Sequence, residues 1–442
     1  MDLRPLHRPT LGVLAALAFL VLPATTRADV LVVSPPGQGG DHAQIADAVL
    51  AAADGDVILV RAGTYSAPVL ADDKGVSVQA EAGVTPRLGG SLNVRNLAAG
   101  KTFSWRGVEL RPFFGADPLV VDDNEGHVRF EDALIQTNAE QGNGATVRRS
   151  GSVSFLRCDL RGAPGLNSCT DCPGTWPPLP GGGGAFLRLS SVAFYDCFLR
   201  GGQGGSDVEL EGAFGARGGP GLEVVGGRVH LSGCALTGGG GGQGGCEFTL
   251  AFGYLYCSEG GDGGAALWAR GDAKITRLDT LLLPGGGGAG GECGTCGIPP
   301  AGPGQQGLAQ QLEGTASTSR ITTVRRGLTA TSPVREGGAV TFVYEGVEGD
   351  AVALWGSLSG GWVFLPEHAG VFLQGFPLVQ NVGVPLGVAG PGGLLVVDVP
   401  VGELGPGVEG FAAFLQASYV PLSTGVLGLG PSGAVVLLDG AL

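Results

Sequence analysis

The chain has 442 residues, 85 of them glycine, and a formal net charge of −14 at pH 7. Glycines without a period of three exclude a collagen triple helix, and a helical bundle is disfavoured because glycine costs about 1 kcal/mol per helix position. The excess of 40 acidic over 26 basic side chains argues against nucleic-acid binding, whereas 43% apolar residues are enough to build a core. A protein of many short strands joined by glycine turns is expected.

The first 28 residues are typical of a secretory signal peptide. Arg4, His7 and Arg8 precede an apolar run at 11–22, which is too short to span a bilayer but suits a signal sequence. Small residues follow, and cleavage after Ala28 is expected. No later segment has the long uninterrupted apolar run of a membrane helix. We therefore expect a secreted, periplasmic or cell-surface protein without a membrane span in the mature chain.

A short strand at 29–33, an amphipathic helix at 42–53 and further strands at 57–60 and 76–78 are expected next. This order, with DGDVILVRAGTY after the helix and DKGVSVQAE further on, resembles the opening of pectin-lyase-like proteins. The resemblance implies an all-β fold, a right-handed parallel β-helix whose first coil is capped by the helix. Many members of that superfamily act on polysaccharides.

An internal repeat occupies the middle of the chain. Eight-residue segments that begin at Val128, Val153, Val192 and Val229 align without gaps, and a looser fifth begins at Ile275. A constant strand motif at unequal spacing predicts one coil per repeat with inserts at one position. A parallel β-helix with glycine-rich loop inserts is thus predicted over residues 29–310.

The repeat also predicts how side chains are stacked. Phe130, Phe155 and Phe194 should form an aromatic column inside the coil, because equivalent residues of stacked strands lie about 4.8 Å apart. A column of small residues beside it should contain Ala133, Cys158, Cys197 and Cys234. The inserts leave at glycines that we expect to adopt positive φ and to allow close stacking, namely Gly162, Gly201, Gly238 and Gly285.

The composition changes near the end of the repeats. Gln, Ser and Thr replace the glycine runs, and residues 311–334 are interpreted as a linker. Beyond it, β-rich runs recur every 10–25 residues between Gly, Pro and Asn turns. This spacing predicts a compact β-sandwich over residues 335–442.

Nine cysteines fall into two groups. The three in the repeat strands are expected to be buried thiols. The six in the inserts are expected to form local disulfides, because each pair shares one insert of an exported chain. The pairs are Cys169–Cys172, Cys246–Cys257 and Cys293–Cys296. A zinc site or a redox centre built from the two CxxC pairs remains an alternative.

No residues match a lyase or hydrolase motif, so nothing catalytic follows from the resemblance. An alternative enzyme site would contain Asp132, Arg157 and Asp196, which occupy the same outward position of successive coils. The two carboxylates would lie about 9.6 Å apart, at the limit for an inverting glycosidase. We favour a solvated charge ladder, in which Arg157 lowers the pKa of Asp196. The histidines at 42, 127, 230 and 368 are expected to be surface or strand residues.

Two acidic runs are weak candidates for a calcium site, although neither matches an EF-hand loop. They comprise Asp122, Asp123 and Glu125, and Asp207, Glu209 and Glu211. Since calcium needs six to eight oxygen ligands, we favour solvated carboxylates and expect no metal and no cofactor. The sequence favours a non-enzymatic exported structural or binding protein that recognises a polysaccharide or another cell-envelope component. A polysaccharide lyase or glycoside hydrolase is the alternative.

Overall fold

The computed structural model describes residues 28–113, 117–137, 141–168, 177–207, 213–249, 254–292, 299–365, 368, 370–375 and 384–442. The expectation of a mostly β protein is confirmed, since strands β1 to β36 make up most of the described elements. Within those ranges, no helix has the length and apolar character needed to cross a membrane. The expected signal peptide lies outside the described residues except for Ala28.

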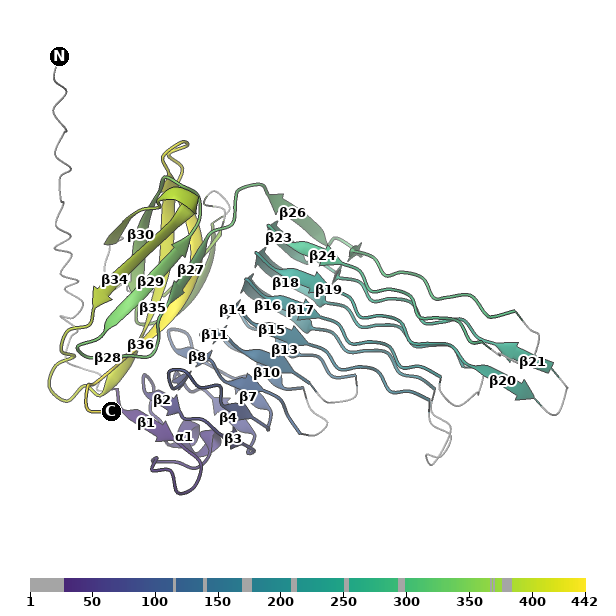
Figure 1. The fold of residues 1–442 in the computed structure, drawn as a ribbon, viewed down its shortest axis with the longest axis horizontal. Coiled ribbons are helices and arrows are strands. Elements are labelled where there is room, and N and C mark those ends of the chain that lie inside the picture. Colours follow the sequence, from purple (N-terminus) through teal and green to yellow (C-terminus); the bar gives the residue numbers. More distant parts are fainter. Residues whose placement is uncertain are drawn as a thin grey trace, which may run out of the picture.

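The first part of the chain forms a stack of parallel strands in which successive passes add strands to three rows (Figure 1). Row 1 consists of β1 (Val30–Val33), β2 (Val57–Val60), β5 (Ser77–Ala80), β8 (Thr102–Arg106), β11 (His127–Glu131), β14 (Val153–Leu156), the second halves of β16 (Ala185–Tyr195) and β18 (Leu222–Ser232), β23 (Lys274–Leu278) and β26 (Ser317–Ile321). Row 2 consists of β4 (Val69–Asp72), β7 (Leu92–Arg95), β10 (Leu119–Asp122), β13 (Ala145–Arg148), the first halves of β16 and β18, β22 (Leu267–Arg270) and β25 (Gln310–Leu312). Row 3 consists of β3 (Thr64–Tyr65), β6 (Arg87–Leu88), β9 (Glu109–Leu110), β12 (Leu134–Gln136), β15 (Asp159–Arg161), β17 (Phe198–Arg200), β19 (Ala235–Thr237) and β24 (Leu281–Leu283).

The strand register agrees with the alignment of the sequence repeats. Val128 pairs with Val153, Val153 with Val192, Val192 with Val229 and Val229 with Ile275, all in parallel. Because every partner occupies the same repeat position, equivalent side chains are stacked from one pass to the next. The repeat motif is therefore confirmed as the unit of the stack.

The core of the stack is built from inward-facing columns. The rings of Phe130 and Phe155 are stacked at 5.1 Å, and those of Phe155 and Phe194 at 4.9 Å. Cys158, Cys197 and Cys234 are buried free thiols, as expected. The single helix described, α1 (Ile45–Ala51), is shorter than predicted and buries its apolar face against β1, β2 and β4 at the first passes.

The last part of the chain forms a five-stranded and a three-stranded sheet that share one apolar core, and a separate hairpin. A five-stranded sheet contains β28 (Val334–Arg335), β36 (Gly428–Leu438), β35 (Gly410–Pro421), β30 (Asp350–Ser357) and β33 (Val384–Val388). A three-stranded sheet contains β27 (Gly327–Ala330), β29 (Ala339–Glu345) and β34 (Leu394–Pro400), and a hairpin pairs β31 (Gly360–Leu365) with β32 (Gly370–Gln374). The turn η2 (Pro391–Gly393) precedes β34. We refer to β27–β36 as the C-terminal sheets.

The segment interpreted as a linker contributes strands to both parts. The parallel stack continues to Ile321, because β25 pairs with β22 and β26 pairs with β23. Further along the predicted linker, β27 pairs with β29. The change to Gln, Ser and Thr therefore accompanies the last pass of the stack, where no further described strand pairs with β25 or β26 and most residues are exposed or half-buried.

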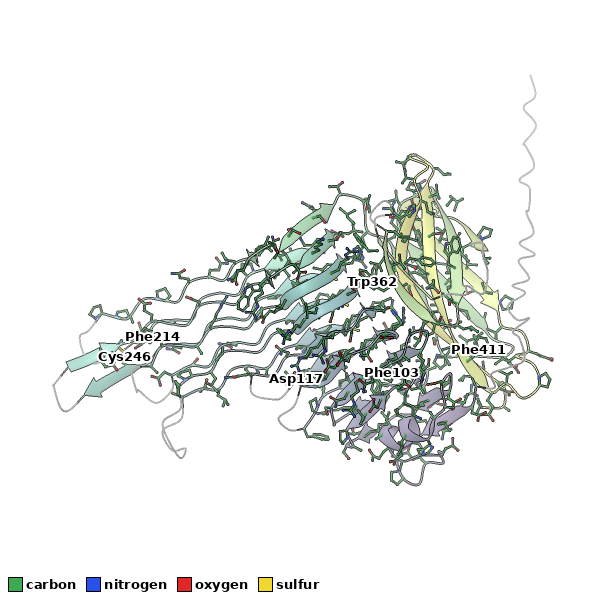
Figure 2. All side chains as sticks on the ribbon, turned by 180° about the vertical axis from the view of Figure 1, so that it is seen from behind. Phe103, Asp117, Phe214, Cys246, Trp362 and Phe411 are labelled. Atoms are coloured by element: carbon green, nitrogen blue, oxygen red, sulfur yellow. A yellow bond between two sulfur atoms is a disulfide. The ribbon has the colours of Figure 1, made fainter. Side chains whose placement is uncertain are left out.

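The C-terminal sheets lie alongside the stack and cover the outward face of row 1 (Figures 1 and 2). At one end, Val436 and Leu438 pack with residues of β1 and β2. Further along, Val371 and Leu373 of the hairpin pack against a patch made by Leu156, Ala193 and Tyr195.

Candidate functional site

The glycine-rich inserts form an array of extended segments that project from the stack (Figure 1). In the outgoing segments, Gly201 donates its N–H to the carbonyl of Thr237, the last residue of β19 before the next outgoing segment, and Gly202 donates to Gly182 of a returning segment. The third residue, Gln203, points its side chain to solvent. This three-residue period is that of a polyproline II helix, which makes no internal hydrogen bonds. The pattern recurs in the bonds Gly204 to Gly240, Gly205 to Leu179 and Asp207 to Gln243.

We define the glycine array by its two layers. The outgoing layer comprises residues 162–168, 201–207, 238–246 and 285–292, and the returning layer comprises 177–184, 213–221, 257–266 and 299–309. In the segments before the last pass, about two of every three backbone N–H groups donate to a backbone carbonyl of another segment, one within a layer and one between layers. In the last pass, 285–292 and 299–309, the donations to backbone carbonyls run between the layers. The array is therefore a hydrogen-bonded slab, although it contains little regular strand.

The role expected for the insert glycines is wrong in one respect. Gly162, Gly201, Gly238 and Gly285 do not have positive φ, whereas Gly233 in the turn after β18 does. The insert glycines are instead required by close approach, because an added Cβ would overlap a neighbouring carbonyl oxygen. Two layers that hydrogen-bond through carbonyl groups leave no room for a side chain between them. The expectation of close stacking is confirmed.

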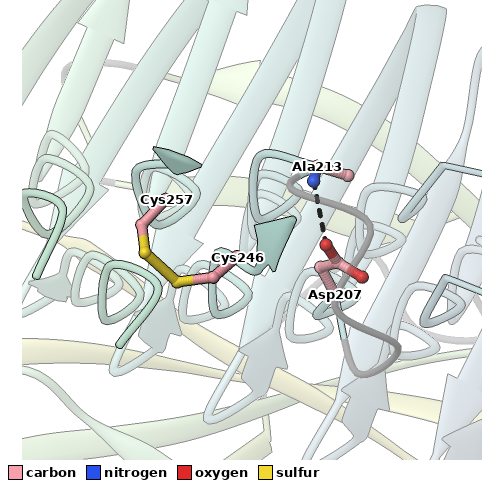
Figure 3. Close-up of a disulfide and its surroundings, with 4 residues drawn as sticks. All are labelled: Asp207, Ala213, Cys246 and Cys257. Carbon is pink, nitrogen blue, oxygen red and sulfur yellow. Dashed lines mark hydrogen bonds between the residues drawn. A yellow bond between two sulfur atoms is a disulfide. The ribbon is translucent and has the colours of Figure 1, made fainter. Parts of the chain in front are cut away.

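A disulfide joins Cys246 and Cys257 at the far end of the array (Figure 3). The two residues are paired in the hairpin of β20 (Cys246–Thr249) and β21 (Tyr254–Cys257), with Cα atoms 4.0 Å apart. This bridge confirms one of the three predicted pairs. Cys169, Cys172, Cys293 and Cys296 lie outside the described residues, so their pairing stays a prediction.

The two environments of the cysteines predict different reactivity. Cys158, Cys197 and Cys234 are buried, and burial raises the pKa of the Cys197 thiol far above its usual value. Because the thiolate is the reactive form, we expect iodoacetamide to label none of the three in the native protein and all three in denaturant. Mass spectrometry of non-reduced peptides measures this, and should also recover the Cys246–Cys257 peptide. Rapid labelling of Cys197 in the native state would contradict the buried column.

The predicted catalytic residues occupy one turn position after successive strands of row 1. Asp132, Arg157 and Asp196 have φ of 53°, 50° and 56°, a left-handed conformation that polar residues adopt more readily than branched apolar ones. Gly233 and Asp279 continue the series at 66° and 46°. The shared position thus reflects a tight bend between rows 1 and 3, and the structure brings only Asp132 and Arg157 into contact.

Asp132 and Arg157 belong to a larger cluster of charged side chains. Arg157 Nε donates to Asp132 Oδ1 at 2.6 Å, and Arg106 Nε donates to Asp132 Oδ2 at 3.2 Å. Arg157 Nη2 also donates to Glu131 Oε1 at 2.5 Å, and Arg129 Nη2 donates to Glu131 Oε2 at 2.8 Å. We call these five residues the charged joint. Arg129 and Glu131 are almost completely buried.

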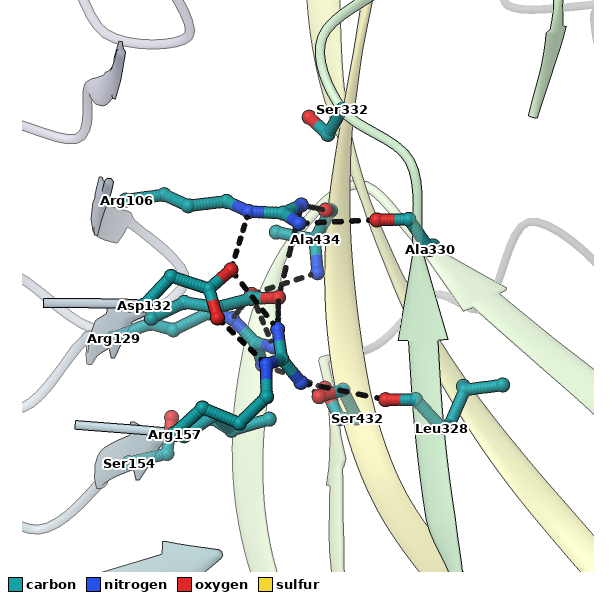
Figure 4. Close-up of polar contacts among 12 residues, drawn as sticks. Arg106, Arg129, Asp132, Ser154, Arg157, Leu328, Ala330, Ser332, Ser432 and Ala434 are labelled. Carbon is teal, nitrogen blue, oxygen red and sulfur yellow. Dashed lines mark hydrogen bonds and ion pairs between the residues drawn. The ribbon is translucent and has the colours of Figure 1, made fainter. Parts of the chain in front are cut away.

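The arginines of the charged joint donate to the backbone of the C-terminal sheets (Figure 4). Arg106 Nη2 donates to the carbonyl of Ala330 at 3.0 Å, and Arg129 Nη2 donates to that of Ser432 at 2.7 Å. Arg157 Nη1 reaches the carbonyl of Leu328 at 3.4 Å. Further contacts are Arg106 Nη1 to the Ala434 carbonyl, Arg129 Nη1 to Ser432 Oγ and the Ala434 N–H to Glu131 Oε2.

The electrostatics of the joint disfavour proton transfer. Burial alone would raise the pKa of Glu131, but Arg106, Arg129 and Arg157 outweigh burial and hold that pKa well below its usual range. A general acid needs a pKa near the working pH and access to substrate. Glu131 has neither, and its oxygens are occupied by guanidinium groups and a backbone amide. The cluster is built to join two sheets.

The expected surroundings of Asp196 are wrong. Its Oδ1 pairs with Arg325 Nε at 2.6 Å, and its side chain is only 18% exposed. Burial raises the pKa of Asp196, while Arg325 and, less strongly, Arg157 act to lower it. The sequence could not show that the chain returns after β26 and covers this position. The result is a sheltered ion pair away from the charged joint.

His127 and His230 are strand residues of β11 and β18, as one part of the expectation had it, but they are fully buried rather than at the surface. Ser152 Oγ lies 2.7 Å from His127 Nδ1, and Gly360 of β31 packs on the ring, where an added Cβ would overlap it. The His230 ring lies 5.5 Å from that of Tyr195. Both histidines are on the outward face of row 1, and the C-terminal sheets cover them.

These histidines predict an acid-sensitive fold. Burial, helped by Arg129, lowers the pKa of His127 to about 3, and burial lowers that of His230 to about 4. Histidines of the unfolded chain have a pKa near 6.5, whereas those of the folded chain stay neutral to a lower pH. The free energy of unfolding is therefore fully retained above pH 6.5 and decreases as the pH falls below it. Each contributes about 1.4 kcal/mol per pH unit in that window. Urea unfolding at pH 7.0 and 5.0 should show a clear loss of stability.

The matched control is the double variant His127→Gln and His230→Gln. It lacks the two titrating groups, so its unfolding free energy should fall much less between the same two pH values. A variant that loses as much stability as the wild-type chain would contradict the assignment of the acid sensitivity to these residues.

The carboxylates considered for calcium have protein partners. Asp122 and Asp123 pair with Arg149 at 2.9 and 2.6 Å. Asp207 accepts hydrogen bonds from Ser168 Oγ and the N–H of Ala213, as Figure 3 shows for the second. Glu125 is exposed in the turn after Asp123, and Glu209 and Glu211 lie outside the described residues. In the part of the chain that the structure describes, no three His, Cys, Asp or Glu side chains gather as a metal site would require.

No known family model and no curated protein matches this sequence. Function is therefore argued from the geometry of the charged joint and the glycine array. The joint's residues Arg106, Arg129 and Glu131 were missed by the sequence analysis. Arg129 and Glu131 alternate with the apolar Val128 and Phe130 along β11, which signals an outward face but not what covers that face.

Proposed function

We propose that the chain is an exported, non-enzymatic structural or binding protein of the cell surface or extracellular space. In this proposal the parallel stack is a right-handed β-helix of the pectin-lyase-like kind, α1 is its N-terminal cap, and the C-terminal sheets are a β-sandwich. Three parallel rows with one strand of each per pass support the β-helix. Fold alone does not fix an activity, so the function rests on the sites.

The observation that carries the proposal is the covered face of row 1. Two of the predicted enzyme residues, Asp132 and Arg157, belong to a cluster that is hydrogen-bonded to the C-terminal sheets. Its carboxylates are paired with arginines, and although the Asp132 side chain is still 36% exposed, Glu131 is buried. Hydrolysis of a glycosidic bond needs two carboxyl groups on either side of an open substrate groove. A buried joint with backbone partners favours a rigid scaffold over catalysis.

The glycine array supports a binding role for the surface that the scaffold presents. Its outgoing layer exposes side-chain amides at three of the third-residue positions, Asn167, Gln203 and Gln243, although Asn167 Oδ1 also accepts the N–H of Ser206. Amide groups on a flat, rigid surface suit the hydroxyl groups of a neutral polysaccharide, because little conformational entropy is lost on binding. We propose the outgoing layer as the glycan-binding surface.

A panel of neutral and acidic polysaccharides tests this function with the mature chain. Affinity electrophoresis measures binding, and assays of reducing ends and unsaturated products measure turnover. We expect binding without turnover. The double variant Gln203→Ala and Gln243→Ala should weaken binding, whereas Gln305→Ala, an exposed glutamine of the returning layer, should not. No binding to any member of the panel would reject glycan recognition.

Asp196→Asn distinguishes the scaffold from the alternative enzyme. Because burial raises the pKa of Asp196, its surroundings already favour the neutral form, so replacing it with the neutral Asn should lower the unfolding free energy only slightly. Denaturant titration measures this, and glycan binding should be unchanged. The enzyme alternative would be established by two results together. The wild-type chain would turn over a polysaccharide, and the folded variant would do so at least a hundredfold more slowly.

A further inference from the structure

The last pass of the parallel stack ends in open strand edges. Among the residues that the structure describes, strands β24, β25 and β26 each pair with one neighbour only, namely β19, β22 and β23. Figure 1 shows no other element lying beyond β26 along the stack. Repeat proteins usually close such an end with a polar cap, since open edges recruit other strands. The opposite end carries α1, so the two ends differ.

The inward column of row 1 changes character at this end. Phe194 is followed by Leu231, then by Arg277 in β23 and Arg320 in β26. Two guanidinium groups thus continue a column of buried apolar side chains. Leu312, at an inward position of row 2, is 41% exposed because no further pass covers it.

These two arginines have no acidic partner in the described ranges, where every other buried or half-buried arginine of row 1 is paired. The ion pairs of Arg106, Arg129 and Arg157 all involve Glu131 or Asp132, and none includes Arg277 or Arg320. Arg277 Nε is buried without a hydrogen-bond acceptor. Burial, and then Arg320, lowers the pKa of Arg277, which means that the stacked cations repel each other.

We infer that the open end of the stack is a docking platform for an extended, acidic segment of a partner protein. The segment adds a strand to β26 and brings a carboxylate into the column above Arg320. Strand addition satisfies the free backbone groups of the edge, and an alternate side chain gives specificity. A second copy of this chain fits less well, because its own end would bring two more arginines to the same column.

Short synthetic peptides test the platform on the full mature chain. The probe alternates Val and Thr with a central Glu, and the control peptide has Lys in place of Glu. Fluorescence anisotropy should give binding of the Glu peptide about tenfold tighter than the Lys peptide, because like charges in a desolvated column repel. Hydrogen exchange should slow at β26 amides when the Glu peptide is present.

Two variants localise the effect. Arg320→Glu should reverse the preference between the peptides, and Arg320 is exposed enough for the substitution to leave the fold intact. Arg188→Glu makes the same change at an exposed outward position of β16 and should leave the preference unchanged. Equal binding of both peptides, or no binding of either, would overturn the inference. So would self-association of the wild-type chain that Arg320→Glu abolishes, since the occupant would then be a second copy.

Discussion

Replacing Glu131 with alanine is expected to destabilise the protein by about 3–5 kcal/mol, because removal of one partner leaves buried charges uncompensated. Within the described part of the chain, Glu131 is the only carboxylate that contacts both Arg129 and Arg157, and Arg129 is completely buried. Without Glu131, the guanidinium of Arg129 would remain in the joint with only Ser432 as its polar partner. Chemical denaturation of the full chain measures the loss.

The control for this substitution is Asp72→Ala. Asp72 pairs with Arg95 on the solvent side of row 2, where both side chains are more than 40% exposed. An exposed pair of this kind is weakened by solvent and contributes little, so the stability should hardly change. If Glu131→Ala lowers the unfolding free energy as little as Asp72→Ala does, the charged joint does not hold the C-terminal sheets on the stack.

The second large effect is expected from Gly202→Ala. An alanine Cβ at this position would overlap the carbonyl oxygen of Ala163, and both residues are held by hydrogen bonds between the layers. Overpacking against a backbone that cannot move costs about 1–3 kcal/mol or more. We expect a comparable loss of stability, with faster hydrogen exchange in the neighbouring glycine segments.

Gly286→Ala is the matched control in the same array. Nothing lies within 4 Å of an added Cβ there, because Gly286 is the solvent-facing third residue of its period. The unfolding free energy of the Gly286→Ala variant should stay within about 0.5 kcal/mol of the wild-type value. Equal effects of the two substitutions would contradict the close contact between the layers.

The repeat strands could be predicted from the sequence because their information is local. Val128, Phe130 and Cys158 occupy repeat positions that can be aligned without knowing the fold, and the structure stacks those positions in register. The bridge between Cys246 and Cys257 could be predicted for the same reason, since both cysteines belong to one insert. Short sequence separation and a strict period make such features visible.

The charged joint could not be predicted because its partners are distant in the sequence. Arg129 and Ser432 are separated by 303 residues, and Arg106 and Ala434 by 328. The alternation in β11 reveals an outward face, but water and a second sheet are equally compatible with it. The residues that cover His127 and Asp196 are likewise distant in the sequence, which explains why the burial of these two side chains was not predicted.

The glycine array shows a different limit. From the sequence alone, Gly202 is compatible with a flexible loop, a turn of positive φ or a packed slab, since each of these favours a residue without a side chain. Only the hydrogen bonds between Gly182, Gly202 and Gly219 distinguish the slab. Those bonds depend on how several inserts align, which no single insert encodes.

Hydrogen exchange of the amides that bridge the C-terminal sheets and row 1 tests most directly whether the charged face of row 1 is closed. The amide of Ala434 donates to Glu131 Oε2 at 3.1 Å, and that of Gly360 donates to Thr102 Oγ1 at 2.7 Å. If the C-terminal sheets cover this face permanently, both amides exchange only through global unfolding, as slowly as those of the core strand β14. Exchange of both amides as fast as in exposed turns, with β14 still protected, would show that the sheets open and expose the face as a groove.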